Sequence, residues 1–260
     1  MKNKIILCIF SALLILIPAL SACSDGNDPI KAIQDRGELR VGVKVDVPRF
    51  GYLSPVTGQM EGLEIDLARI IAKDILNDEN KVKFLNITAQ TRGPMLDNGE
   101  IDIVIATFTI TEERKKSFDF SRPYFTDELG FLVRSDSGIG RPEDLDGKKA
   151  GVVQAGTAKA SLPDECARLG IDMVLLEYNS YPEVKAALAK GDVDVFVADK
   201  TILYGYIDDD CLLLNEGFNP QQYGIASKKG NEKLAARIDS LIEEVEKDGR
   251  LAALFYDWGL

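Results

Sequence analysis

Residues 98–106 read NGEIDIVIA, and residues 190–198 repeat the same pattern as KGDVDVFVA. In each copy a glycine suited to the left-handed conformation closes a helix, and a mostly β-branched strand follows. One polar residue comes after the strand, Thr107 in the first copy and Asp199 in the second. Ligands of open α/β sheets bind beyond the carboxyl ends of the strands. The repeat therefore predicts two α/β lobes that direct polar side chains into one cleft.

The flanking sequence extends each copy to a β-α-β-α-β unit. The first unit reads as strand 39–45, helix 62–76, strand 82–87, helix 91–98 and strand 101–106. The second reads as strand 150–154, helix 157–169, strand 173–177, a helix opened by the capping-box pair Ser180 and Glu183, and strand 193–198. A chance likeness between two α/β stretches is the alternative for the nine-residue match alone. We expect the chain to cross between lobes near residues 124–128 and 220–223.

The amino terminus predicts export. Lys2 and Lys4 precede an apolar run over residues 5–17 that is short for a bilayer span. The small residues before Cys23 resemble a bacterial lipobox, which implies cleavage before Cys23 and attachment of lipid to its sulfur. An ordinary signal peptide with an incidental cysteine is the alternative. We expect residues 1–22 to be a signal peptide and residues 23–29 a tether to the cell envelope, in the periplasm or on the outer face of the cell membrane.

Composition excludes several functions. The formal net charge of the 260 residues is −11, and removing residues 1–22 takes away two lysines and no acid, so the mature charge of −13 argues against nucleic acid as a partner. The chain has no histidine, which removes the usual general base, the Ser-His-Asp triad and most zinc sites. We expect no catalytic, metal or cofactor site. Cys166 and Cys211 are left either as a disulfide or as two buried thiols.

Polar residues after the predicted strand 101–106 form a candidate anion site. Thr111 is a good N-cap, so free amides and the helix dipole face the preceding loop. Arg114 follows within one turn, where its guanidinium can grip a carboxylate. A capped helix with a solvated arginine is the alternative. The pair Gly156 and Thr157 offers the same turn and exposed amides in the second lobe.

Three more charged residues stand at the edges of predicted elements. Asp199 is either a surface acid paired locally or the one negative charge in a cleft, and its place in the repeat favours the cleft. Lys44 ends a strand and Arg92 opens a helix. Solvation is the usual state of a single lysine or arginine, but together these residues form a cationic cluster that the acidic composition does not predict.

Several motifs in combination resemble the family 3 extracellular solute-binding proteins of polar amino-acid ABC importers. They are GLEIDLA at residues 62–68, TFTITEERKK at residues 107–116, the residues Phe118, Asp119, Phe120, Ser121, Pro123 and Tyr124, and QYGIA at residues 222–226. The stretches VGVK at residues 41–44 and TRGP at residues 91–94 resemble the aspartate/glutamate-binding branch. The resemblance implies an α/β periplasmic-binding-protein type II fold with two lobes joined by two hinge strands. Residues 30–125 and 222–260 would form one lobe, and residues 126–221 the other.

The resemblance also implies a role for each candidate residue. Arg114 and Thr109, with an amide near Thr157 and Ala158, would hold the α-carboxylate of an amino acid. Asp199 with Thr107 would hold its α-ammonium group. Lys44 and Arg92 would take a side-chain carboxylate, and Tyr223 is also expected in the ligand-binding set.

Charge counting agrees with an acidic ligand, because three cations and one acid match two carboxylates and one ammonium group. Leaving a buried cation unpaired costs about 3–5 kcal/mol, so glutamine would be rejected by roughly a hundredfold. The sequence predicts a monomeric, lipid-anchored receptor that captures aspartate or glutamate and presents it to an ABC permease in the membrane. It does not distinguish these two acids. Two rivals remain, an enzyme resembling the cyclohexadienyl dehydratases and a surface adhesin.

Overall fold

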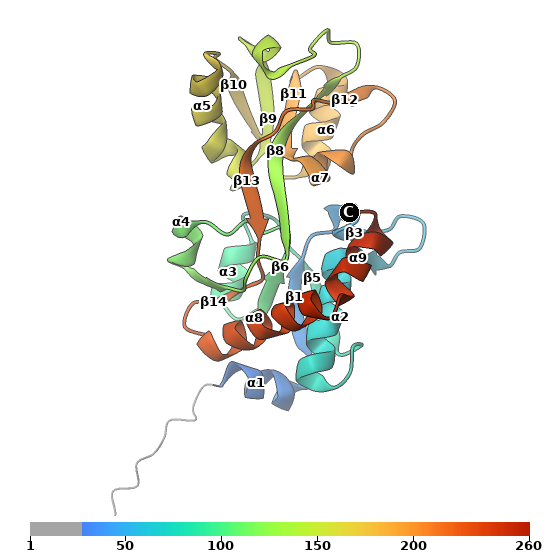
Figure 1. Ribbon diagram of the computed structural model, residues 1–260, viewed down its shortest axis with the longest axis vertical. Helices are drawn as coiled ribbons and strands as arrows, with labels where there is room; N and C mark the ends of the chain where they lie inside the picture. Colours follow the sequence, from blue (N-terminus) through green and yellow to red (C-terminus); the bar gives the residue numbers. More distant parts are fainter. Residues whose placement is uncertain (1–27) are drawn as a thin grey trace, which may run out of the picture.

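Two α/β lobes make up the computed structural model of the protein, which describes residues 28–260 (Figure 1). Lobe 1, the lower one in Figure 1, contains the elements from α1 to β7 and from β14 to α9. Lobe 2, the upper one, contains those from β9 to β12. Two antiparallel strands, β8 (Phe125–Arg134) and β13 (Phe218–Tyr223), run between the lobes. The predicted signal peptide and Cys23 lie outside the described residues.

Lobe 1 is built on a mixed sheet in the order β5-β1-β6-β14-β7. Its strands are β1 (Leu39–Val43), β5 (Val82–Asn86), β6 (Ile103–Ile105), β7 (Phe118–Phe120) and β14 (Ala226–Lys228). The first three are parallel, and β14 runs antiparallel to both β6 and β7. A small antiparallel sheet follows β1, with strands β2 (Asp46–Val47), β3 (Gly51–Leu53) and β4 (Met60–Glu61).

Helices cover the lobe 1 sheet on both faces. They are α1 (Pro29–Arg36), α2 (Leu63–Leu76), α3 (Arg92–Asp97), α4 (Glu112–Lys115), α8 (Glu232–Lys247) and α9 (Arg250–Trp258). The face of α2 that carries Leu63, Leu67 and Ile71 is fully buried and contacts β1. The two C-terminal helices pack on this lobe, so both ends of the described chain belong to it (Figure 1).

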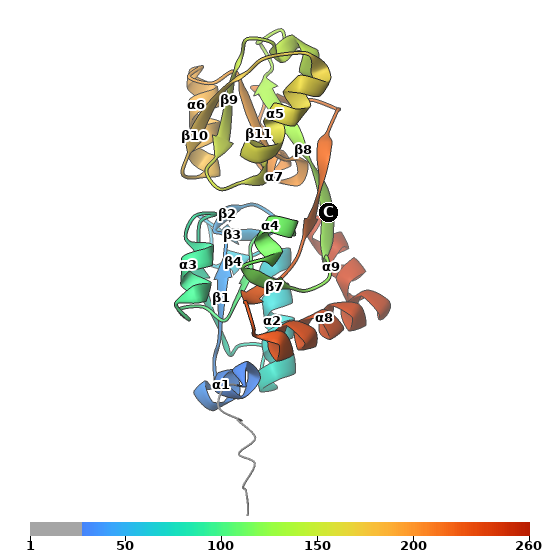
Figure 2. The same ribbon diagram turned by 90° about the vertical axis from the view of Figure 1, so that its left-hand side faces the viewer.

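Lobe 2 has a sheet in the order β10-β9-β11-β8-β12, with β13 also paired to β8. Its other strands are β9 (Lys149–Val153), β10 (Val174–Tyr178), β11 (Val195–Asp199) and β12 (Cys211–Leu213), and its helices are α5 (Thr157–Leu169), α6 (Tyr181–Lys190) and α7 (Lys200–Tyr204), with a 3₁₀ turn at Pro142–Leu145. Alternate residues of β11 pack into different clusters, Val195 with α5 and Phe196 with α6. These helices therefore cover opposite faces of the sheet (Figure 2).

The repeat in the sequence corresponds to equivalent positions in the two lobes. Gly99 and Gly191 follow helices with φ of 70° and 79°, and β6 and β11 then run through the middle of their sheets. The predicted α/β two-lobe fold is confirmed. One local prediction is wrong: Ser180 stands at the N-cap of α6, but its side chain makes no capping bond. The carboxylate of Glu183 accepts instead from the amide of Asn179 at 3.1 Å.

Side chains join the lobes away from the strands that connect them. The Tyr206 hydroxyl of lobe 2 donates to the backbone oxygen of Asp46 in lobe 1. The Arg49 guanidinium of lobe 1 lies 5.1 Å from the centre of the Tyr204 ring in lobe 2. The two lobes are thus in direct contact in this conformation.

The sequence did not decide whether the two cysteines form a disulfide. Both are free thiols in the structure, Cys166 buried in α5 and Cys211 half-buried in β12. Between residues 28 and 260, no helix combines the length and the hydropathy that a membrane span requires.

Candidate ligand-binding site

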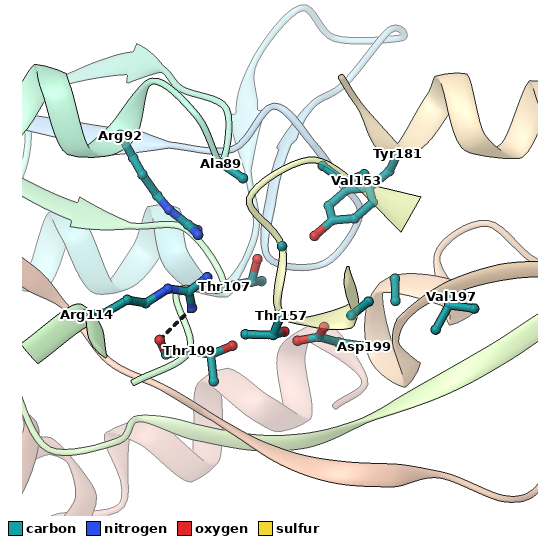
Figure 3. Close-up of a pocket in the computed structure, with 13 residues that line it drawn as sticks. Ala89, Arg92, Thr107, Thr109, Arg114, Val153, Thr157, Tyr181, Val197 and Asp199 are labelled. Carbon is teal, nitrogen blue, oxygen red and sulfur yellow. Dashed lines mark hydrogen bonds between the residues drawn. The ribbon is translucent and has the colours of Figure 1, made fainter. Parts of the chain in front are cut away.

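Seven of the predicted site residues line one cavity between the lobes (Figure 3). Lobe 1 contributes Arg92, Thr107, Thr109 and Arg114, and lobe 2 contributes Thr157, Ala158 and Asp199. The cavity measures about 20 Å³, which is close to the space of a single water molecule. An amino acid therefore enters only when the lobes move apart or the wall shifts.

Two guanidinium groups form the lobe 1 side of the cavity. The Cζ atoms of Arg92 and Arg114 lie 3.7 Å and 4.7 Å from the centre of the Phe108 ring. Both groups donate to the backbone oxygen of Ala155 in lobe 2, at 3.4 Å and 3.2 Å. Neither has a carboxylate partner in the described part of the chain. Burial lowers the pKa of Arg92 to about 9 and that of Arg114 to about 10, so both remain charged at neutral pH.

Local structure fixes the direction of Arg114. The Thr111 hydroxyl caps α4 by accepting from the Arg114 amide at 3.1 Å, as the sequence predicts. The guanidinium then donates from Nη1 to the backbone oxygen of Thr109 at 2.7 Å. The Thr109 hydroxyl donates in turn to Oε1 of Gln221 at 2.8 Å. The other terminal nitrogen of Arg114, Nη2, extends to lobe 2, where it donates to the backbone oxygen of Ala155 at 3.2 Å.

Asp199 is the acid on the opposite side (Figure 3). It ends β11 and is 6% exposed. Burial raises its pKa to about 7, partly offset by the Tyr223 hydroxyl, which donates to its carboxylate. That hydroxyl also lies 3.2 Å from the carboxylate of Asp127, a like charge that raises the Asp199 pKa further. A cationic ligand group placed here would stabilise the ionised form of Asp199.

Two predicted residues do not line the cavity. The ammonium group of Lys44 forms an ion pair with Asp46 at 2.9 Å and lies 5.1 Å from the centre of the Tyr181 ring. Tyr223 is fully buried behind Asp199 and reaches the site only through its hydroxyl.

Sequence reasoning missed two residues. Tyr181, the first residue of α6, lines the cavity and directs its hydroxyl into it (Figure 3). Glu64 lies under the wall, where Oε1 accepts from the Thr107 amide at 2.5 Å. A signal existed for Glu64, since it belongs to the quoted stretch at residues 62–68, but nothing in the sequence near Tyr181 marks it.

The cavity thus presents two cations on one side and one carboxylate on the other. This arrangement fits a zwitterion, whose carboxylate and ammonium group need opposite partners when water is excluded. Backbone amides at the start of α5, at Thr157 and Ala158, add donors on the lobe 2 side. Within residues 28–260, no group of three or more acidic or cysteine side chains is arranged to hold a metal ion.

A model of the bacterial extracellular solute-binding proteins, family 3, matches residues 39–260. The chain belongs to this family. It is therefore a solute-binding protein and not an enzyme, and the family description also agrees with the predicted export from the cytoplasm.

Different relatives of this chain are named for different ligands. The ABC transporter glutamine-binding protein GlnH of Bacillus subtilis is 39% identical, covering 89% of this chain and 85% of that protein. The glutamine-binding protein of Geobacillus stearothermophilus is 43% identical, covering 79% and 78%. The glutamate-binding protein GluB of Corynebacterium glutamicum is 29% identical, covering 90% and 83%. Among solved structures, the cysteine-binding protein of Campylobacter jejuni superposes with a TM-score of 0.81 at 32% identity, covering 89% and 92%.

Proposed function

We propose that this solute-binding protein captures a polar α-amino acid between its lobes and delivers it to the permease of an ABC importer. The observation that carries the proposal is the placement of Arg114 and Asp199 on opposite sides of one cavity between the lobes (Figure 3). The relatives described above, which are named as glutamine-, glutamate- and cysteine-binding proteins, support amino acids as the ligand class.

The common part of the amino acid is held by both lobes. Arg114 takes the α-carboxylate from lobe 1, and the amides of Thr157 and Ala158 take it from lobe 2. The Thr109 hydroxyl joins Arg114 by turning from Gln221, to which it donates in this structure, towards the ligand. Asp199 takes the α-ammonium group, together with Thr107. Because the contacts are complete only with the lobes together, the ligand shifts the population towards the closed form.

Glutamine is the first candidate for the ligand. The ion pair between Lys44 and Asp46 removes Lys44 as a partner for a side-chain carboxylate. The two curated glutamine-binding relatives support the same choice.

An acidic amino acid, aspartate or glutamate, is the second candidate. Arg92 lines the cavity with no carboxylate partner among the described residues, so an anionic side chain would complete its pairing. The stretch at residues 91–94, which resembles the aspartate/glutamate branch, supports this candidate as well.

The working protein is a monomer held outside the cytoplasm by lipid on Cys23. The stretch before Cys23 supports this part of the proposal, and mass spectrometry of the membrane-extracted protein tests it. A mass that contains residues 1–22, or an unmodified cysteine, rejects the anchor.

Calorimetric titration tests the ligand. Protein freed of ligand by unfolding and refolding is titrated with glutamine, glutamate, aspartate, asparagine and cystine. We expect tight binding of glutamine, the first candidate, or of an acidic amino acid, the second, and weaker binding of asparagine and cystine. If none of the five binds, the proposed function is wrong.

A further inference from the structure

Asp127 is an acid in the connection between the lobes that the ligand contacts proposed above do not use. It belongs to the part of β8, residues 125–128, that pairs with β13 before the strand joins β11 in the lobe 2 sheet at Leu129. Its carboxylate lies 3.2 Å from the Tyr223 hydroxyl of β13. Asp127 therefore stands where the two connecting strands run side by side, and it does not line the cavity.

Backbone and hydroxyl donors hold the carboxylate of Asp127 in place. Its Oδ1 accepts from the Glu128 amide at 2.8 Å, and its Oδ2 accepts from the Thr201 amide at 3.0 Å. The Thr201 hydroxyl donates to the same Oδ2. Thr201 belongs to the first turn of α7, the helix that directly follows Asp199. Asp127 is therefore fastened to the segment that carries the acid of the candidate site.

Tyr223 joins the two carboxylates. Its hydroxyl donates to Oδ2 of Asp199 and lies within hydrogen-bonding distance of Oδ2 of Asp127. Its ring is fully buried against Phe50 of lobe 1 and Phe125 of β8, with ring centres 5.9 Å and 5.8 Å away. This packing fixes the position of the hydroxyl, which has a single proton to offer to two carboxylates.

The shared hydroxyl also sets the distance between the two negative charges. Both carboxylates lie within hydrogen-bonding distance of one oxygen, so their nearest oxygens are no more than about 6 Å apart. At this range, like charges in a partly buried site interact strongly. The other charged or titratable groups near the pair are Arg92, Arg114, Tyr181, Glu128 and Lys200. Of these, Glu128 and Lys200 pair with each other at 2.9 Å, and the two arginines face Asp199 across the cavity.

We propose that Asp127 is a positioning residue that acts on the α-ammonium group of the ligand through Tyr223 and Asp199. This inference rests on the proposed amino-acid-binding function and deepens it. The negative charge of Asp127 attracts the ammonium group that Asp199 binds, and it equally favours a proton on Asp199 when no ligand is present. The ligand and the proton therefore compete for the same pair of carboxylates.

Calorimetric titration of Asp127→Asn between about pH 5 and about pH 8.5 tests this role. The ligand is glutamine, or the tightest binder of the other four amino acids above if glutamine does not bind. Because variant and wild type receive the same ligand, its own titration cancels in the ratio of their dissociation constants. At about pH 8.5, where Asp199 is ionised in both proteins, the variant should bind about tenfold more weakly, the size of one charge at this range. At about pH 5 the affinities should be equal, because the wild type must first release a more tightly held proton from Asp199.

A second variant removes the link between the two acids. Tyr223→Phe keeps the buried ring and deletes the hydroxyl that donates to Asp199. Losing this donor favours the protonated form of Asp199, so the pH below which affinity falls should rise by about one unit. Relative to the wild type, Tyr223→Phe should therefore bind more weakly at low pH, the opposite pattern to Asp127→Asn.

Asp136→Asn is the matched control. It makes the same substitution just beyond the other end of β8, where the Asp136 side chain is 81% exposed. Its ratio to the wild type should stay close to one at every pH. A purely structural role of Asp127 would instead weaken binding by the same factor across the whole pH range.

A ratio for Asp127→Asn that is independent of pH, or that increases towards low pH, overturns the role of Asp127. If Asp127→Asn does not fold, Tyr223→Phe decides, and a ratio that is independent of pH overturns the proposal, because Asp127 reaches the site through that hydroxyl. If the wild type binds none of the five amino acids, the proposed function is overturned instead.

Discussion

Replacing Lys44 by methionine distinguishes a structural role of this lysine from a ligand-binding one. Lys44 and Asp46 form an ion pair at 2.9 Å, with side chains only 6% and 15% exposed. Removing one member of a buried pair leaves the other charge uncompensated, at a cost of about 3–5 kcal/mol. Because Asp46 keeps some contact with water, we expect the lower end, about 3 kcal/mol. For a chain of this size, that corresponds to a fall of about 10 °C in Tm.

Thermal and urea unfolding of the ligand-free protein measure this loss of stability. Calorimetry measures the ratio of the dissociation constants for glutamine and glutamate, which we expect to stay within about threefold of the wild-type ratio. The exposed pair of Lys31 and Asp35 is a matched control, because it has the same separation of 2.9 Å but side chains that are 67% and 65% exposed. Lys31→Met should cost less than about 1 kcal/mol. The double variant Lys44→Met with Asp46→Asn should regain most of the stability.

The opposite result would refute the reasoning. If Lys44→Met unfolds like wild type but loses glutamate binding by a hundredfold, Lys44 holds the ligand side chain and the pair with Asp46 opens in solution.

Three further predictions concern the cavity and the closed form. Arg114→Ala should weaken binding of every amino acid by at least about a hundredfold in calorimetry, since it leaves the buried α-carboxylate of the ligand unpaired. Arg114→Lys should restore only part of the lost affinity. A loss of affinity for one ligand alone would contradict a contact with the carboxylate that all the ligands share. The raised pKa of Asp199, about 7, means that the empty protein binds protons more tightly than the unfolded chain, so its stability should fall as pH rises from about 4 to about 7, and Asp199→Asn should flatten that part of the curve in pH-dependent unfolding. Tyr206→Phe removes the hydroxyl that donates to Asp46, and it should weaken ligand affinity by about fivefold without touching the ligand, as measured by titration; unchanged affinity would show that this contact does not favour closure.

The repeat made most of the architecture predictable. Strand and helix periods are local properties, and Gly99 and Gly191 mark the ends of helices because only glycine adopts φ near 70° without strain. Each copy then directs a polar residue to the same edge of its sheet, so Thr107 and Asp199 were found without knowledge of the tertiary structure.

The rest of the site depends on how distant segments approach one another. Lys44 reads as a free cation in the sequence, but the chain turns after β1 into the small sheet β2-β3-β4, which the sequence did not predict, and this turn brings Asp46 beside it. Tyr181 reaches the cavity only because lobe 2 faces lobe 1. Glu64 stands on the buried face of α2, one turn before Ala68, but periodicity does not show that it meets Thr107 and Tyr124 beneath the cavity.

The contacts that join the lobes outside the cavity have a consequence for measured affinity. Tyr204 against Arg49, and Tyr206 against Asp46, contribute to closure whatever the ligand is. Two proteins with identical cavities can therefore respond to different concentrations of the same nutrient, because contacts outside the cavity contribute to the free energy of lobe closure. A biosensor built on this chain would be retuned there, by changing Tyr204 or Arg49, with its chemical selectivity left intact.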